Sequence, residues 1–173
     1  MAEQKKTITV TLQVKEMVFD VMNRTYLTGV SRKAEQAKNY EAAANMQASD
    51  DNEHSYQIRR SLNSAFATLK VELGEYLKED GSTSNNLIKQ ENDNDGVLTM
   101  AFELPSNFNN SSCDALGGGL HEFCVQQTIF DWFTITNKAD AADYQALAQL
   151  ALDRAKKAMY KRERPSRPAY NWQ

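Results

Sequence analysis

The sequence is poor in the residues that define several classes of protein. Its 173 residues include two cysteines, three prolines and seven glycines, too few for a disulfide scaffold or a collagen-like chain. No apolar run approaches the ~20 residues that a membrane-spanning helix needs, and the first six residues are polar rather than the start of an apolar leader. We therefore expect no secretion and no membrane partner, and we expect Cys113 and Cys124 to stay reduced.

The charges that are present divide the chain into two unequal parts. The formal net charge is −3 at pH 7, but from Arg154 onward there are seven basic residues and one acidic residue, a balance of +6. The first 153 residues therefore carry −9. A segment opposite in charge to its own body suits an acidic partner, a nucleic acid or another copy of the chain. For 154–161 the alternative is a solvated helix end that complements the helix dipole.

Two segments alternate apolar and polar residues with the period of a β-strand. The first is 7–14, where isoleucine, valine and leucine alternate with threonine and glutamine. The second is 97–104, which follows an Asp-Gly turn signal and ends before a proline. We expect 87–89 to be its partner strand in a β-hairpin.

Apolar residues at helical spacing predict two helices in the first half of the chain. A short helix begins near Met17 and is expected to end at Gly29, since glycine is common just past a helix end. The clearest helix is expected over 52–77. Asp50 and Glu53 have the spacing of a reciprocal capping box at its start.

Two more helices are expected in the second half. The first has candidate caps at Ser111, Ser112 and Asp114, and it contains three consecutive glycines, 117–119. Because each glycine costs about 1 kcal/mol in a helix, either the helix begins after them or neighbouring backbone packs very close there. The last helix is expected over 139–161. Its inward side chains are expected to be Leu147, Leu150, Ala151, Ala155, Ala158 and Met159.

Together these elements predict an α+β protein that is mostly helical. We expect a helical bundle with a β-hairpin and an N-terminal strand, followed by an extended C-terminal arm. Residues 1–161 are expected to form a single domain. Residues 162–173 are expected to form the arm, because Pro165 and Pro168 cannot continue a helix.

Short motifs that imitate known chemical sites each fail at a required position. The run 91–96 resembles the start of a calcium loop, but the twelfth position, which needs an acidic ligand, is Phe102. His121 opens an imitation of the zinc-protease motif, but Val125 stands where the second histidine belongs. Cys124 lies one helical turn from His121, yet its place on an apolar stripe favours a packing role. We therefore expect no enzyme activity, no metal and no cofactor.

The basic end of the chain is the strongest candidate for a functional segment. Prolines and aromatic residues between its basic residues suit an arm that lies along another protein. The residues expected to contact a neighbouring subunit or another protein are Arg162, Arg164, Pro165, Arg167, Pro168, Tyr170 and Trp172. The alternative is a small cytoplasmic nucleic-acid-binding accessory protein that makes phosphate contacts. In that case the basic residues in use are Lys156, Lys157, Lys161, Arg162 and Arg164.

Several motifs follow one another in a recognisable order. After a Thr-alternating strand and a short helix come Ile58-Arg59-Arg60, Leu104-Pro105-x-x-Phe108, His121-Glu122 and Asp131-Trp132-x-x-Ile135-Thr136-Asn137. A last helix then leads into a basic, proline-containing tail. This order resembles small structural proteins of tailed phages and prophages, in particular the head–tail connector class that forms the neck, or adaptor, ring.

The resemblance implies a virion structural protein in the phage neck, present in the host cytoplasm before assembly. It implies a homo-oligomeric ring, twelvefold in this class, whose extended termini clasp neighbouring subunits. The implied partners are the portal protein, other neck or tail proteins, and DNA that passes through the lumen without sequence-specific binding. The predicted strands give more β-structure than the mainly helical adaptors have. A second neck ring or a tail-completion protein is therefore the alternative position in the virion.

Overall fold

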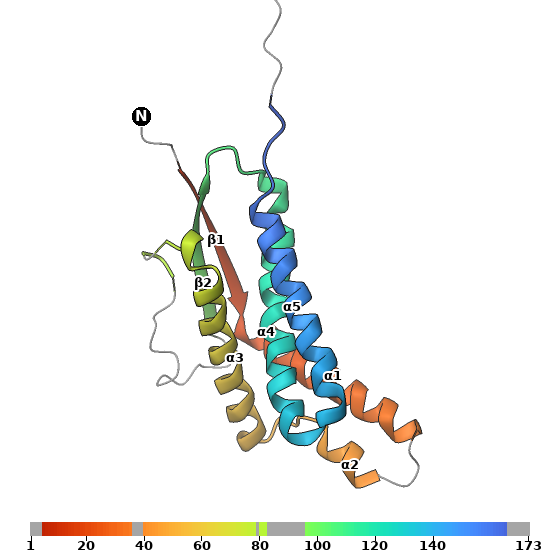
Figure 1. Cartoon of the computed structure of the whole chain (residues 1–173). Helices are drawn as coiled ribbons and strands as arrows, with labels where there is room; N and C mark the ends of the chain where they lie inside the picture. Colours follow the sequence, from red (N-terminus) through yellow and green to blue (C-terminus); the bar gives the residue numbers. More distant parts are fainter. Residues whose placement is uncertain (1–4, 36–39, 79, 83–95, 166–173) are drawn as a thin grey trace, which may run out of the picture.

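The computed structural model describes residues 5–35, 40–78, 80–82 and 96–165 (Figure 1). It confirms the expected class, α+β and mostly helical. In chain order the elements are β1 (Lys5–Gln13), α1 (Val14–Glu35), α2 (Tyr40–Asn45), α3 (Asn52–Glu72), a 3₁₀ turn (Gly74–Tyr76), β2 (Val97–Pro105), a second 3₁₀ turn (Asn110–Ser112), α4 (Cys113–Thr136) and α5 (Lys138–Met159).

The two described strands pair with each other. β1 and β2 are antiparallel, with Lys5 opposite Pro105 and Gln13 opposite Val97. The predicted alternation of β2 is confirmed, because its apolar residues are buried: Leu98, Met100, Phe102 and Leu104. The partner strand expected at 87–89 lies outside the described residues. The described partner of β2 is therefore the N-terminal strand, which comes from the far end of the sequence.

α1 follows β1 directly and continues past Gly29, so the predicted helix end at Gly29 is wrong. The cause is packing against α5. The hydroxyls of Thr28 and Tyr144 lie 2.8 Å apart in a hydrogen bond, and Arg32 forms an ion pair with Asp140. These contacts hold the last turns of α1 and outweigh the cost of about 1 kcal/mol for a glycine inside a helix.

α3 carries the clearest predicted stripe, and these apolar residues are buried: Ile58, Leu62, Phe66, Leu69 and Leu73. The α-helix ends at Glu72, earlier than predicted, where a 3₁₀ turn beginning at Gly74 follows. The predicted capping box is also wrong. The N-cap is Asp51, which makes no side-chain capping bond; its carboxylate instead accepts a hydrogen bond from the Ser49 hydroxyl at 2.6 Å.

α4 is the central helix and packs against α5, α3, α1 and β1. The glycines 117–119 lie inside it. At Gly119 an added Cβ would lie 3.0 Å from the Cβ of Ala155 and 3.1 Å from the carbonyl oxygen of Ala151. Of the two interpretations of the glycines, close packing of neighbouring backbone is therefore confirmed.

The predicted burial of α5 is partly wrong. The alanines named above and Met159 are buried, but Leu147 is 44% exposed and Leu150 is 61% exposed. At the close approach to Gly119, the residues of α5 that meet α4 are Ala151 and Ala155, and Leu152 of α5 is buried as well. The helix is turned so that the other two of its three leucines, Leu147 and Leu150, face solvent.

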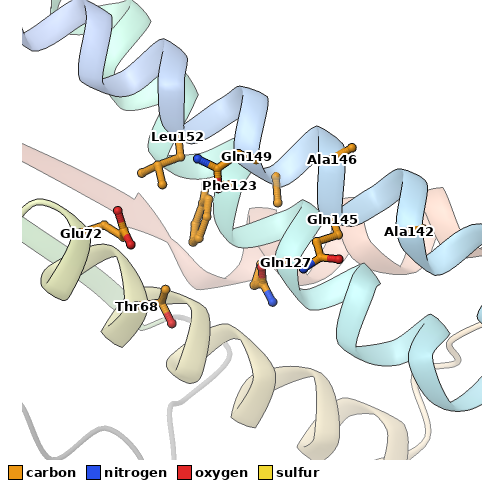
Figure 2. A pocket seen from close by; sticks show the side chains of 10 residues that line it. Thr68, Glu72, Phe123, Gln127, Ala142, Gln145, Ala146, Gln149 and Leu152 are labelled. Carbon is orange, nitrogen blue, oxygen red and sulfur yellow. The ribbon is translucent and has the colours of Figure 1, made fainter.

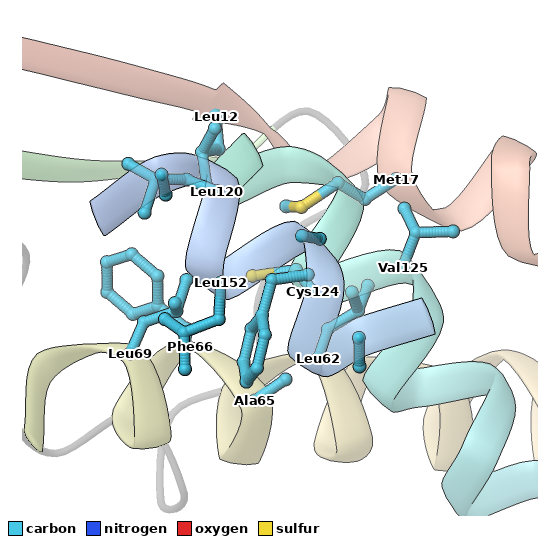
Figure 3. Packing of buried hydrophobic residues seen from close by; sticks show 14 of the residues in the cluster. Leu12, Met17, Leu62, Ala65, Phe66, Leu69, Leu120, Cys124, Val125 and Leu152 are labelled. Carbon is cyan, nitrogen blue, oxygen red and sulfur yellow. The ribbon is translucent and has the colours of Figure 1, made fainter. Parts of the chain in front are cut away.

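A single hydrophobic core joins the sheet to the long helices. Figure 3 shows Leu12 of β1, Met17 of α1, Phe66 of α3, Leu120 of α4 and Leu152 of α5 around a common interior. None of these five side chains is more than 5% exposed. The helices that carry the surfaces described below are therefore held in fixed relative positions.

Candidate functional site

The chain beyond α5 is fastened to the loop that follows β2. The backbone carbonyl of Lys161 accepts a hydrogen bond from the N–H of Asn109 at 3.1 Å. Two residues later the N–H of Glu163 donates to the carbonyl of Asn107 at 2.8 Å. Between these bonds the chain forms an isolated antiparallel β-bridge. The chain then leaves the body at the end where α4 begins (Figure 1).

Three of the seven residues predicted to form the arm are described. Arg162 turns back onto the body, where its Nη1 donates to the carbonyl of Met159 at 2.8 Å. Arg164 and Pro165 are exposed. The other four lie outside the described residues: Arg167, Pro168, Tyr170 and Trp172. The part of the arm that stands away from the body therefore begins at Arg164, not at Arg162.

The basic residues of the alternative nucleic-acid interpretation are only partly available. Lys156 on α5 donates to a carboxylate oxygen of Glu72 on α3 at 2.7 Å. Lys157, Lys161 and Arg164 are exposed. Arg162 is exposed too, although one nitrogen of its guanidinium donates to the Met159 carbonyl, so four of the five predicted positions carry exposed cations.

His121 and Cys124 do not form a reactive couple. The Nε2 of His121 lies 2.8 Å from a carboxylate oxygen of Asp20 on α1. Cys124 is fully buried, and its burial raises the pKa of its thiol to about 12. A thiol with that pKa is not a thiolate near neutral pH, so Cys124 has the packing role that its stripe predicted.

The burial of Cys124 predicts that the two cysteines differ in their reactivity toward a thiol reagent. At pH 8 we expect a thiol reagent such as Ellman's reagent to modify half-buried Cys113 and to leave Cys124 unmodified until the chain unfolds. The measurement is the number of thiols titrated before and after adding denaturant. In a Cys113→Ser variant the native chain should titrate no thiol. Prompt reaction of that variant would contradict the buried position of Cys124.

A ladder of polar contacts fixes one face of α1. The contributing residues are spaced four apart: Asp20, Arg24, Thr28 and Arg32. Their partners on α4 and α5 are, in the same order, His121, Glu122, Tyr144 and Asp140. Hydrogen bonds from Arg24 hold the pKa of Glu122 below its usual range, and those from Arg32 do the same for Asp140. Sequence reasoning missed this ladder, although its four-residue spacing is visible in the sequence.

Large apolar side chains are exposed on α1 and α5, two of the three helices that this ladder joins. On α1 they are Phe19, Tyr26, Leu27 and Val30. On α5 they are Leu147 and Leu150, and Leu27 and Leu147 line one shallow groove between the helices. Exposed apolar side chains that lie together, as Leu27 and Leu147 do, mark contact sites for other proteins. This is a second surface that the sequence analysis missed, because it assigned both leucines to the core.

A second groove, of about 400 Å³, lies between α3 and α5 (Figure 2). Phe123 of α4 forms its apolar floor together with Leu152, and glutamines line its wall: Gln127, Gln145 and Gln149. Amide side chains donate and accept hydrogen bonds but do not titrate near neutral pH. Thr68 and Glu72 also line the groove, and the Glu72 carboxylate is ion-paired with Lys156. The groove can therefore hold a polar chain through hydrogen bonds.

Comparisons with known proteins give no family assignment. No family model, no curated protein and no solved structure matches the chain. In the described part of the chain, no three His, Cys, Asp or Glu side chains are grouped so that they could hold a metal ion. The calcium-loop imitation falls mostly outside that part. Within the described ranges, none of the helices has the length and apolarity to cross a bilayer.

Proposed function

We propose that this chain is a structural subunit of a homo-oligomeric ring in the head–tail connector of a tailed phage, joining portal to tail. One observation supports this most directly. The chain beyond α5 is anchored by two backbone hydrogen bonds and then leaves the body at Arg164 as an exposed, proline-containing segment. Because its root is fixed, such a segment reaches a neighbour from a defined position and loses less entropy on binding.

The charge distribution supports contact between copies. The arm predicted over 162–173 has three basic residues and one acidic residue, a balance of +2, and residues 1–161 carry −5, so the arm of one copy is attracted to the body of the next. A contact between two different surfaces repeats from copy to copy and closes into a ring when its rotation allows. By resemblance, the ring contacts the portal and other neck or tail proteins, and DNA passes through its lumen.

The second candidate is a nucleic-acid-binding accessory protein. The observation that favours it is the group of exposed cations near the end of α5: Lys157, Lys161, Arg162 and Arg164. Phosphate contacts by such residues make binding strongly dependent on salt. The ion pair of Lys156 with Glu72 weakens this candidate, because it occupies a cation that the candidate needs.

Deletion of residues 164–173 separates the two candidates and keeps the anchor at 161–163 intact. For a ring subunit we expect the truncated chain to keep its circular dichroism spectrum and to lose the large assembly, as measured by light scattering. For a nucleic-acid-binding protein the mass stays unchanged, and salt-dependent DNA binding is lost in a titration.

A matched variant tests which part of the arm acts in assembly. Arg164→Gln together with Arg167→Gln removes two charges and keeps Tyr170 and Trp172 as apolar anchors. Because an anchored aromatic side chain contributes more than an exposed charge at an interface, we expect this variant to assemble, with greater sensitivity to salt. Complete loss of assembly in this variant would show that charge, not the aromatic residues, holds the arm.

A further inference from the structure

The exposed face of α5 has a regular pattern that the arm does not explain. Asp143, Leu147, Leu150 and Arg154 are all exposed, and they follow one another in steps of four, three and four residues. Residues with this spacing lie in one row along a helix. The row has an acidic residue at its N-terminal end, two leucines in the middle and a basic residue at its C-terminal end.

This row is complementary to itself when two copies of α5 run in opposite directions. If the two helices cross midway between Ala148 and Gln149, Leu147 of one copy lies opposite Leu150 of the other. In the same register Asp143 lies opposite Arg154 of the second copy. Each match occurs twice, because the arrangement has a two-fold axis. A parallel arrangement would place Asp143 against Asp143 and Arg154 against Arg154, so repulsion excludes it.

We propose that α5 is a dimerisation surface on which a second copy of the chain packs antiparallel. Charge complementarity identifies a second copy of the chain as the partner. The acidic end of the row in one copy, Asp143, lies opposite the basic end of the row in the other copy, Arg154. Leu27 of α1 borders the row beside Leu147 and adds apolar area on each side of the two-fold axis. Antiparallel helix dipoles favour the same orientation.

This contact goes beyond the proposed ring. It uses α5 and the edge of α1, whereas the ring contact uses the segment after Glu163. A two-fold contact pairs subunits, so rings that use it stack as pairs with dihedral symmetry. A chain that lacks residues 164–173 should therefore still dimerise.

The test is an exchange of charges in the full chain. Asp143→Arg places arginine opposite arginine in a pair of identical copies, and Arg154→Asp places aspartate opposite aspartate. We expect each variant, purified alone, to show half the wild-type mass by light scattering at low salt. When the two variants are mixed in equal amounts, every pair across the contact is again opposite in charge, so the wild-type mass should return. The double variant, Asp143→Arg with Arg154→Asp, should also have the wild-type mass.

The controls keep this inference separate from the proposed function. All the exchanged residues are exposed in the single chain, so the variants should keep the circular dichroism spectrum of the wild type. Single variants with the wild-type mass, or a mixture that stays at half mass, would overturn the α5 contact whatever the fate of the ring. A wild-type chain that is only a dimer, with single variants that are monomers, would support the α5 contact and contradict the ring.

Discussion

Replacing Gly119 with valine should lower the free energy of unfolding by about 3 kcal/mol, the upper part of the range for overpacked cores. The first carbon of the new side chain would lie 3.0 Å from both the Cβ and the backbone nitrogen of Ala155. The nitrogen belongs to the backbone of α5, so it moves only if the two helices separate. Urea denaturation followed by circular dichroism measures the loss.

Gly118 provides the matched control. It lies in the same helix, is exposed, and an added Cβ there meets nothing within 4 Å. We expect Gly118→Ala to raise the stability by about 1 kcal/mol, the difference in helix propensity between the two residues. If Gly119→Val were as stable as the wild type, the close contact between α4 and α5 would be refuted.

Replacing Glu122 with glutamine should cost about 2 kcal/mol at pH 7, because a charge-assisted hydrogen bond contributes ~1.5–3 kcal/mol. The Arg24 guanidinium donates to both oxygens of this carboxylate, at 2.5 and 2.9 Å. Urea denaturation of the variant and the wild type at pH 7 measures the difference. Glu103→Gln is the control: its surface pair with Lys5 is more exposed and is expected to contribute less than about 1 kcal/mol.

The stability difference between the wild type and the Glu122→Gln variant should depend on pH. Hydrogen bonds from Arg24 hold the pKa of Glu122 in the folded chain below its unfolded value, which is near ~4.3. The stabilisation that the Arg24–Glu122 pair gives the folded chain is therefore fully present above that pH. It is lost as the pH falls through the pKa of Glu122 in the folded chain. The variant cannot titrate at this position, so the stability difference from the wild type should shrink in the interval below about pH 4.3, the unfolded pKa of a glutamate. A difference that stays constant over this interval would contradict the prediction.

The elements of the fold could be predicted where one local pattern decides them. The alternation of β2 and the apolar stripe of α3 each reflect burial on one face, and both are confirmed. The end of α1 could not be predicted, because Gly29 is a stop signal that contacts with α5 override. The two exposed leucines of α5 were misassigned for a similar reason, since the close fit of Gly119 against α5 sets the rotation of that helix.

The candidate site could likewise be predicted only where a local pattern in the sequence indicates it. Composition and charge predict the arm as a distinct segment over 162–173, and beyond residue 165 this stays a prediction. They could not reveal that its root at 161–163 is bridged to 107–109, because that pairing joins distant parts of the sequence. The self-complementary row on α5 was visible as a sequence of charges and leucines, but it has meaning only once the structure shows that Leu147 and Leu150 face solvent.

Self-assembly into a ring is decided by the mass of the whole chain in solution. Light scattering at low and high salt should be combined with negative-stain images of the same fractions. We expect a closed oligomer much larger than a dimer, visible as rings, whose mass falls when residues 164–173 are removed. A full chain with the same mass as the truncated chain, and with no rings in the images, would contradict it.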